Sequence, residues 1–273
     1  MFLALKQDIL PNTVTPLVQY DNKVSIVNTG DFNLVSNVCP HQNSKIARCT
    51  TQLLQCPYHG LQFDLDGNGI DNNHKLETWK TYANQTMLFD QDVTYTFPID
   101  TQYMKLVQHR VDYVKASTEV IMDVFLDIEH IPVAHQGVYD QIGIQDVSEL
   151  KCNTFTNGSI QLVPGQDIDY QIPEDQTYGL GACWMAVYPG TMIEWQPGAM
   201  FITVALDVDQ GSRVQVYKYQ DTRYDSEVFK LNNRVWETAW AQDRELSEMI
   251  VAPALSNLDA LKQHHRNWMQ HDL

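Results

Sequence analysis

Basic residues are scarce in this chain. Its 273 residues include 18 Lys and Arg against 34 Asp and Glu, which gives a formal charge of −16. A protein that binds nucleic acid needs a basic face to meet the phosphate backbone. The charge balance therefore argues against nucleic acid as a partner.

Long apolar runs and targeting segments are also missing. No stretch approaches the roughly 20 apolar residues that a helix needs to cross a bilayer. The opening MFLALKQDIL is too short, and too soon interrupted by charge, for a signal peptide. The chain has no internal repeats and no low-complexity stretch. These absences predict a soluble, cytoplasmic protein with no membrane partner.

Cysteine is too sparse and too unevenly spread for a disulfide framework. The chain has five cysteines: Cys39, Cys49, Cys56, Cys152 and Cys183. In a cytosolic protein, cysteines that lie close to histidines are more often metal ligands. Cys49, between two such pairs, is expected to be a spare buried thiol.

The first third of the chain predicts a small all-β module. Its apolar runs are short, rich in β-branched and aromatic residues, and separated by Asp-Asn and Thr-Gly turn signals. The expected strand-like runs include residues 17–21, 23–27, 32–38, 52–56, 61–69 and 86–97. A boundary at Pro98 divides the chain into predicted domains 1–98 and 99–273.

The second part combines helices with strands. Ser117 or Thr118 can cap a helix over 117–131, because the apolar residues that follow keep helical spacing. Strands are expected at 101–114, 182–189, 191–196, 199–208 and 213–220, and a long helix at 226–253. The predicted fold class is α+β, an N-terminal all-β domain followed by an antiparallel sheet flanked by helices.

Two Cys–His pairs stand in the first domain. Cys39-x-His41 and Cys56-x-x-His59 are interleaved, so each loop supplies one sulfur and one imidazole. Four such ligands could hold zinc. They could also hold a [2Fe–2S] cluster in which two histidines replace two cysteines on one iron. The interleaving favours the cluster, with the two cysteines on one iron and the two histidines on the other.

These loops resemble a Rieske domain. The resemblance rests on CPH…CPYHG followed by Phe63 and a glycine turn. It implies that a [2Fe–2S] cluster is bound by the two Cys–His pairs. The neighbouring DLDGNG (64–69) begins like a calcium loop, but Lys75 stands where that loop needs a bidentate Glu. A β-turn is predicted there.

A second metal site is indicated by DVFLDIEHIPVAH (123–135). His130 and His135 are five residues apart, about 140° around an ideal helix, so they could not meet one ion on a regular helix. Pro132 lies between them and is expected to break the helix. Asp127 precedes His130 by three residues, on nearly the same face. Two histidines and one carboxylate form the facial triad of non-haem Fe(II) oxygenases.

Asp243 is the predicted carboxylate of that triad. An acid is costly to bury within an apolar stripe unless a charged group meets it. The stripe comprises Trp236, Trp240, Asp243, Ser247 and Ile250. Glu237, Glu245 and Glu248 fall elsewhere on the helix and are expected to be solvated.

The whole chain then resembles the alpha subunit of the Rieske non-haem iron ring-hydroxylating oxygenases. The cluster domain, the D-x2-H-x4-H segment and a late Asp stand in that family's order. The resemblance implies that His130, His135 and Asp243 ligate a mononuclear Fe(II). It also implies a head-to-tail homotrimer. In that trimer Asp127 links the two centres by accepting hydrogen bonds from its own His130 and from His59 of the partner subunit.

The substrate pocket is expected over the sheet. Its candidates are Trp184, Tyr188, Trp195 and Phe201, with Met185 beside them. Strand alternation puts Trp184 and Tyr188 on one face and Met185 on the other, so not all of them can line one cavity. His264 and His265 near the C-terminus are expected to be exposed.

The predicted function is that of a terminal oxygenase. It would use O₂ to hydroxylate or oxidatively demethylate a small organic substrate, and an aromatic substrate is expected. The electrons would come from an NAD(P)H-linked reductase or ferredoxin. A cis-dihydroxylating dioxygenase is the nearest alternative. An electron-transfer protein with a degenerate second site and a zinc protein are alternatives from other classes.

Overall fold

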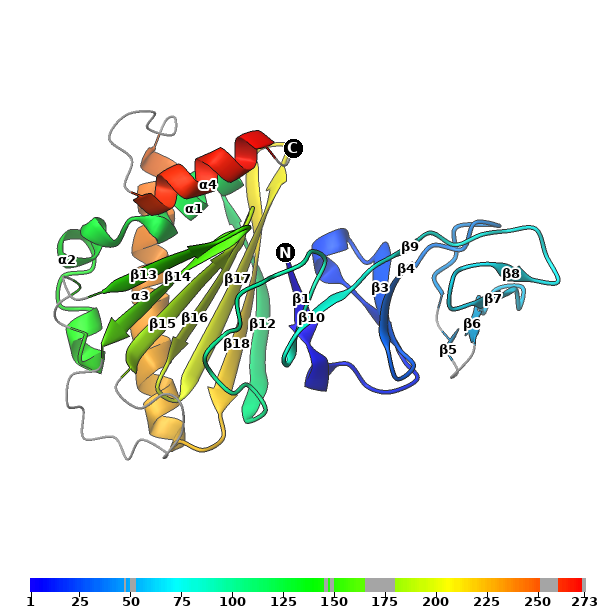
Figure 1. Ribbon diagram of the computed structural model, residues 1–273, viewed down its shortest axis with the longest axis horizontal. Helices are drawn as coiled ribbons and strands as arrows, with labels where there is room; N and C mark the ends of the chain where they lie inside the picture. The colour runs from blue at the N-terminus through cyan, green and yellow to red at the C-terminus, as the bar shows by residue number, and fades with distance from the viewer. Residues whose placement is uncertain are drawn as a thin grey trace. The chain divides into compact units, whose positions relative to one another are not determined.

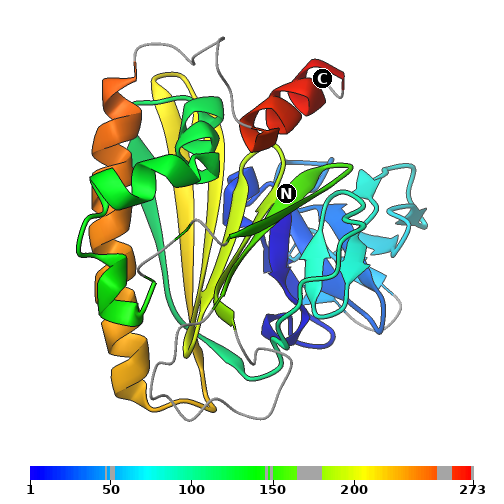
Figure 2. The same cartoon turned by 60° about the vertical axis from the view of Figure 1, so that its left-hand side comes forward.

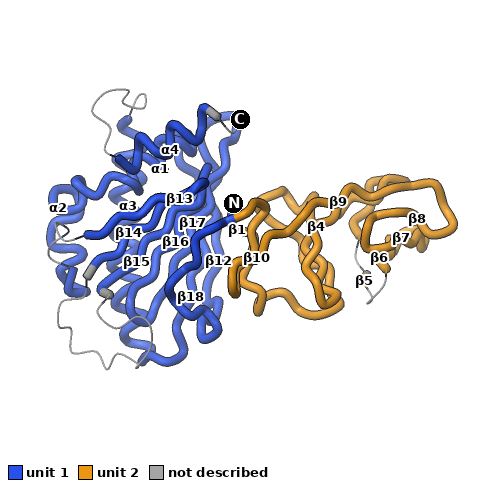
Figure 3. Tube along the Cα trace, in the orientation of Figure 1, with its two compact units in different colours: residues 1, 93–273 blue, residues 2–92 orange. Residues whose placement is uncertain are grey.

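The computed structural model describes residues 1–46, 48–49, 53–144, 147, 150–164, 180–250 and 260–271. The chain forms two compact units, Phe2–Asp92 and Val93–Leu273, the latter including Met1 (Figure 3). The domain boundary expected at Pro98 stays a prediction. Among the described helices, none combines the length and the apolar character that crossing a bilayer requires.

The unit Phe2–Asp92 is built from three small antiparallel sheets. Their strand orders are β1-β11-β10, β2-β3-β4-β9 and β5-β6-β7-β8. The strands are β1 Phe2–Leu5, β2 Val14–Pro16, β3 Val24–Asn28, β4 Phe32–Ser36, β5 Arg48–Cys49, β6 Leu53–Gln55, β7 Gln62–Asp64, β8 Gly69–Ile70, β9 Thr78–Trp79, β10 Tyr82–Asn84 and β11 Met87–Phe89. The all-β character expected of this region is confirmed, and DLDGNG forms the predicted turn between β7 and β8.

Two strand predictions in this unit are wrong in extent. Residues 17–21 were expected to be extended, but Val18–Tyr20 forms a 3₁₀ turn. The turn forms because Asp21 and Asn22 both have left-handed backbones, with φ of 54° and 58°, which Asp and Asn tolerate better than other side chains. In the segment 86–97 the strand ends at Phe89.

The unit Val93–Leu273 is organised around one seven-stranded antiparallel sheet (Figure 1). Its order is β12-β18-β17-β16-β15-β14-β13. The strands are β12 Met104–Val114, β13 Lys151–Phe155, β14 Gly158–Pro164, β15 Leu180–Val187, β16 Thr191–Gln196, β17 Ala199–Val208 and β18 Gly211–Asp221. This sheet with its helices confirms the predicted α+β class.

Helices cover one face of that sheet (Figure 2). The helical elements are α1 Thr118–Leu126, η3 Ile128–His130, α2 Ile131–Ala134, η4 Tyr139–Ile142, α3 Ser226–Met249 and α4 Ala260–His271. Ser117 caps α1 as expected, since its hydroxyl accepts a hydrogen bond from the N–H of Val120 at 3.3 Å. Asp225 caps α3 in the same way through the N–H of Glu227.

The strand register decides which side chains face the helices. Trp184 pairs with Glu194, Glu194 with Phe201, and Phe201 with Lys218, so these four share a face. Phe201 stacks on Trp236 of α3, with ring centroids 5.0 Å apart, which identifies this as the helix side. The sheet therefore presents a row of aromatic and charged groups to α3.

The first helix ends earlier than predicted. It was expected to run to residue 131 and to break at Pro132, but α1 ends at Leu126 and the backbone is extended at Asp127. The Asp127 carboxylate accepts a hydrogen bond from the N–H of Glu129 and so starts a new helical turn. Pro132 sits in the first turn of α2, where its missing N–H costs nothing.

Glu237 is only partly solvated, with 36% of its side chain exposed, and it is also paired, which the sequence did not predict. Its carboxylate accepts two hydrogen bonds from Arg110, at 2.5 and 2.9 Å, and a third from Lys218. The Lys218 side chain is only 1% exposed and its ammonium also lies over the ring of Trp236. Glu237 therefore compensates a cation that the sheet buries, whereas Glu245 and Glu248 are exposed as expected.

The prediction for the C-terminal histidines is also wrong. His265 is fully buried and its ring lies 4.7 Å from that of Tyr188. His264 is partly buried and its Nε2 lies 2.8 Å from the Phe155 carbonyl oxygen. The reason is that α4 packs against α1, a contact between segments far apart in the sequence.

We expect Glu237→Gln to lower the free energy of unfolding by about 2 kcal/mol, because it leaves the buried Lys218 ammonium without its anionic partner. Chemical denaturation of the two proteins measures the difference. Glu245→Gln, on the exposed side of the same helix, is the matched control and should change stability by less than about 0.5 kcal/mol. Equal effects of the two substitutions would contradict the buried pairing.

Candidate metal centres

The two Cys–His loops are built alike. In the first, the N–H of Asn43 donates to the Cys39 carbonyl at 2.9 Å; in the second, the N–H of Gly60 donates to the Cys56 carbonyl at 3.0 Å. Asn43 and Gly60 both have left-handed backbones, with φ of 56° and 74°. Asn and Gly are the residues that adopt this conformation most readily. The two loops thus turn back tightly after each cysteine.

Each loop directs backbone N–H groups at its cysteine sulfur. The Sγ of Cys39 accepts from His41 and Gln42, and the two cysteine sulfurs lie within hydrogen-bonding distance of each other. Burial raises the pKa of Cys56, but hydrogen bonds from the N–H groups of Tyr58 and His59 and from the side chains of Cys39 and Ser44 outweigh it. The resulting pKa lies below that of an ordinary thiol, which suits a sulfur that binds metal as the thiolate.

The two histidines of the loops also lie together. The rings of His41 and His59 have centroids 4.9 Å apart, and both residues are exposed, whereas both cysteines are 1% exposed. The sequence analysis missed His74, whose ring lies 5.6 Å from that of His41. Buried sulfurs and exposed imidazoles fit a cluster whose histidine-bound iron faces solvent.

The predicted triad converges at one point in the second unit. His135 Nε2 lies 2.9 Å from Asp243 Oδ1, and His130 Nε2 lies 3.3 Å from the same oxygen. The two Nε2 atoms are 3.0 Å apart. The turn at Asp127 makes this possible, because it lets η3 and α2 carry both imidazoles to the helix that holds Asp243.

This geometry suits a metal ion bound on one face. An ion held at about 2.1 Å by ligands at right angles has neighbouring ligand atoms about 3.0 Å apart. The distances between the three ligand atoms of the triad, 2.9, 3.0 and 3.3 Å, are close to that value. The donor set of two imidazoles and one carboxylate is that of non-haem ferrous sites.

Electrostatics within the triad favour a charged carboxylate. Burial would raise the pKa of Asp243, but its hydrogen bonds to His130 and His135 hold that pKa below its usual range. Burial would lower the pKa of His135, yet the hydrogen bond to Asp243 and its charge raise it. The carboxylate is thus available as an anionic ligand.

The contacts behind the imidazoles differ between the two histidines. His135 Nδ1 lies 2.8 Å from Oε1 of Gln242, a hydrogen bond that orients the ring. His130 Nδ1 is buried and has no hydrogen-bond partner among the described residues. Asp127 was expected to bond it, but Oδ2 of Asp127 instead accepts from Lys262 Nζ at 2.5 Å. The sequence analysis missed Gln242 and Lys262.

Glu194 is a further acid that the sequence analysis missed. It accepts a hydrogen bond from Trp236 Nε1 at 2.9 Å on the helix side of the sheet. Burial raises the pKa of Glu194 to about 7, and the nearby charge of Asp243 acts in the same direction. An acid in the apolar strand TMIEWQ was the available signal, since the same reasoning had picked out Asp243.

A cavity of about 640 Å³ opens beside the triad. His135 and Tyr139 line it together with aliphatic residues. The charged side chains on its described lining are the carboxylates of Glu129 and Asp140, and no Lys or Arg is among those lining residues. The cavity thus joins one triad ligand to a surface of mixed polarity whose charged groups are acidic.

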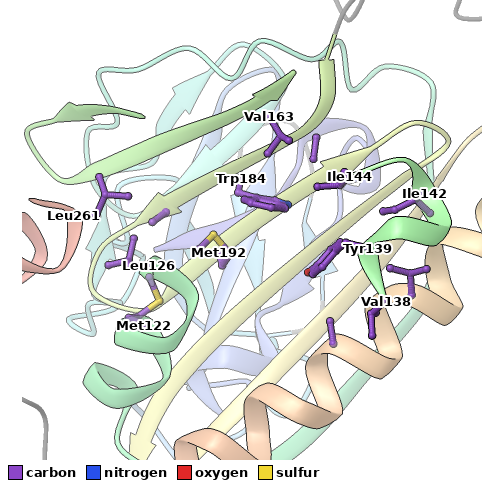
Figure 4. Close-up of a cluster of buried hydrophobic side chains, with 14 of the residues drawn as sticks. Met122, Leu126, Val138, Tyr139, Ile142, Ile144, Val163, Trp184, Met192 and Leu261 are labelled. Carbon is purple, nitrogen blue, oxygen red and sulfur yellow. The ribbon is translucent and has the colours of Figure 1, made fainter. Parts of the chain in front are cut away.

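The four aromatic residues predicted for the pocket do not line this cavity. The ring of Trp184 lies 5.9 Å from that of Tyr139, and both belong to one buried apolar cluster (Figure 4). Tyr188 belongs to the same cluster, and Phe201 stacks on Trp236. Trp195 pairs with Cys183 and Met200 on the opposite face of the sheet, so it cannot share a pocket with Trp184.

Glu194 predicts a pH dependence of stability in protein stripped of divalent metal. Its folded pKa of about 7 lies above its ordinary value of 4.5, so the folded state binds the extra proton between these values. The contribution of Glu194 to the free energy of unfolding is therefore fully present at low pH and is lost as the pH rises through 7. We expect Glu194→Gln to recover about 3 kcal/mol at pH 8 relative to pH 4.5.

Denaturation of both proteins at the two pH values measures that change. Gln keeps an acceptor for the Trp236 N–H, so packing is conserved. Parallel pH profiles for the wild type and Glu194→Gln would show that Glu194 does not titrate within this range.

Comparison with known proteins shows what each part of the chain is similar to. Residues 1–83 match the sequence profile of the Rieske [2Fe-2S] domain. The oxygenase subunit of carnitine monooxygenase from Acinetobacter pittii (strain PHEA-2) is 24% identical over 220 residues, covering 66% of this chain. The matched stretch spans 57% of the length of that relative.

Solved structures extend the likeness over most of the chain. The quaternary ammonium Rieske monooxygenase CntA, bound to the inhibitor MMV12, superposes with a TM-score of 0.67 at 18% identity, covering 91% of this chain and 77% of that one. NdmA of Pseudomonas putida CBB5 with caffeine has a TM-score of 0.58 at 16% identity, covering 98% and 88%. Residues 1–83 therefore match the Rieske [2Fe–2S] domain family, and the chain as a whole shares the fold of these solved structures.

Proposed function

We propose that this protein is the terminal oxygenase of a Rieske non-haem iron system. The convergence of His130, His135 and Asp243 beside the cavity carries the proposal. A Rieske domain alone transfers electrons. A facial triad next to a substrate-sized cavity adds a site where those electrons could reduce O₂ beside a substrate. On this proposal Cys39, His41, Cys56 and His59 hold the cluster.

The residues at the triad have separate tasks. His130, His135 and Asp243 would hold a ferrous ion on one face, which when bound supplies oxygen activation at its open positions. Gln242 orients the His135 ring. Electrons would come from a separate NAD(P)H-linked reductase or ferredoxin, with the protein working in the cytoplasm.

We infer that the substrate is a small cationic amine rather than the aromatic compound that the sequence suggested. The described cavity lining carries carboxylates and no basic side chain, and Tyr139 adds an aromatic face that attracts cations. Two of the named relatives are a carnitine monooxygenase subunit and a quaternary ammonium monooxygenase, whereas NdmA was solved with caffeine. Monooxygenation or oxidative demethylation is the expected reaction, in preference to cis-dihydroxylation.

Asp127 is proposed to link the two metal centres within a homotrimer. A structure of a quaternary ammonium Rieske monooxygenase has been described with inter-subunit electron transfer, at a TM-score of 0.64 and 17% identity over 97% of this chain. Asp127 lies beside His130 in the sequence, and its side chain is 31% exposed, so a partner subunit could reach it. The link would join His130 to His59 of the partner subunit.

Iron content and oxygen uptake test the proposal. The purified chain should hold about three irons, two in the cluster and one at the triad, and Asp243→Ala should lower this to about two with the cluster's absorption unchanged. Oxygen uptake with a reductase should rise with trimethylammonium compounds and not with their uncharged tert-butyl isosteres. The isosteres match the amines in shape and so isolate the charge.

Three outcomes would contradict parts of this proposal. Two irons in the wild type would indicate an electron carrier, and a colourless chain holding zinc would exclude the cluster. Equal uptake with charged and uncharged isosteres would remove the cationic substrate while leaving the oxygenase.

Asp127→Ala should leave both metal centres in place and lower turnover at least about a hundredfold, since it removes the group that connects them. Iron analysis and steady-state oxygen uptake measure the two effects. Glu245→Gln, an exposed carboxylate on α3 outside the cavity lining, is the control and should retain normal turnover. Near-normal turnover of Asp127→Ala would exclude the linking role.

A further inference from the structure

Two complementary rows of charge join α1 to the C-terminal helix α4. Glu119, Asp123 and Asp127 follow one another at intervals of four residues, and so do Lys262 and Arg266. Residues four apart share one face of a helix, as Glu119 and Asp123 do on α1; Asp127 follows directly after the last residue of that helix. Arg266 binds Asp123 and, at 3.1 Å, Glu119, while Lys262 binds Asp127 at 2.5 Å. The two rows therefore meet in antiparallel order.

This contact is a packed interface rather than a loose surface pair. The side chains of Arg266 and Asp123 are 8% and 10% exposed, and that of Lys262 is 17% exposed. Leu261 is buried in the same apolar cluster as Met122 and Leu126 of α1 (Figure 4). The position of Lys262 is thus set by the docking of its helix.

Lys262 binds the Asp127 carboxylate, whereas the nearby His130 has a ring nitrogen without a hydrogen-bond partner among the described residues. Oδ1 of Asp127 accepts from the N–H of Glu129, and Oδ2 accepts from Lys262. His130 Nδ1, three residues along the chain, is buried without a hydrogen-bond partner in the part of the chain that the structure describes. Its Nε2 faces Asp243, so Nδ1 is the atom that a supporting carboxylate would meet.

We propose that Lys262 is a positioning residue that withholds Asp127 from His130. The inference rests on the proposed function, because it gives Asp127 two alternative partners, the ammonium of Lys262 and the imidazole of a metal ligand. A carboxylate that accepts from a ligating histidine fixes the ring and raises its basicity. Release of Lys262 would therefore strengthen the metal site and complete the link through Asp127.

The affinity of the triad for Fe(II) tests this without any measurement of turnover. The protein is used with its cluster intact and its mononuclear site emptied by a chelator, and Fe(II) is titrated anaerobically by calorimetry. Lys262→Met should bind Fe(II) about tenfold more tightly than the wild type, the lower end of the effect of such supporting contacts. Lys262→Arg, which keeps the cation, should bind as the wild type does.

Removal of the carboxylate provides the matched control. Asp127→Ala alone should leave Fe(II) affinity near that of the wild type, because Asp127 does not bond His130 while Lys262 holds it. In the double variant Lys262→Met with Asp127→Ala, the tightening should disappear. Lys262→Gln, which is uncharged but keeps a polar head, should reproduce the tightening if Lys262→Met does not fold.

Unchanged or weaker binding in folded Lys262→Met and Lys262→Gln would overturn the inference, and weaker binding would mean that Lys262 supports Asp127 instead of withholding it. Tightening that persists in the double variant would show that it does not pass through Asp127. A wild type that binds no Fe(II) at the triad would contradict the proposed function itself, which separates that failure from this one.

Discussion

The arrangement of the second unit depends on the interruption of the helix at Asp127. Two histidines five residues apart point in different directions on a regular helix, and no packing of side chains could bring both to one ion. The extended backbone at Asp127 changes the axis, so that His130 ends one short helical turn and His135 follows the next. The same carboxylate that ends α1 caps the new turn, so a single side chain makes the change of direction stable.

The groups between α3 and the sheet explain how the carboxylate of Asp243 can be buried. Asp243 is 7% exposed, which is costly for a carboxylate unless charged or hydrogen-bonding groups meet it. The two imidazoles do so, and the neighbouring Glu194 avoids a second buried negative charge by its raised pKa. Further along the same face, Lys218 and Glu237 balance one another beneath Trp236. Polar groups in this interface are thus compensated locally.

The cluster loops differ from the triad, because backbone N–H groups rather than side chains make most of the hydrogen bonds to the two cysteine sulfurs. Each loop turns back on its cysteine carbonyl and presents consecutive N–H groups to the sulfur. Such hydrogen bonds stabilise thiolate and tune the potential of a bound cluster. The mirrored construction of the two loops leaves the histidines exposed together, where an electron-accepting group outside this unit could approach them.

The sequence by itself determined the chemistry of the sites and the class of the fold. Cys39, His41, Cys56 and His59 could be read from spacing because their loops are local, and the strands and α3 follow from short-range periodicity. The acid at 243 was visible because a charge in an apolar stripe needs a partner. These inferences use neighbours along the chain, which the sequence displays directly.

Only the tertiary structure decided what each of these groups meets. The helix break fell at Asp127 instead of Pro132 because a capping carboxylate competes with the helix, and Pro is tolerated in a first turn. Glu237 proved to be paired, His265 buried and Asp127 bound to Lys262 because strands and helices distant in sequence pack against one another. Such contacts depend on which helix and strand faces pack together. The sequence shows which residues share a face, but not which other face they contact.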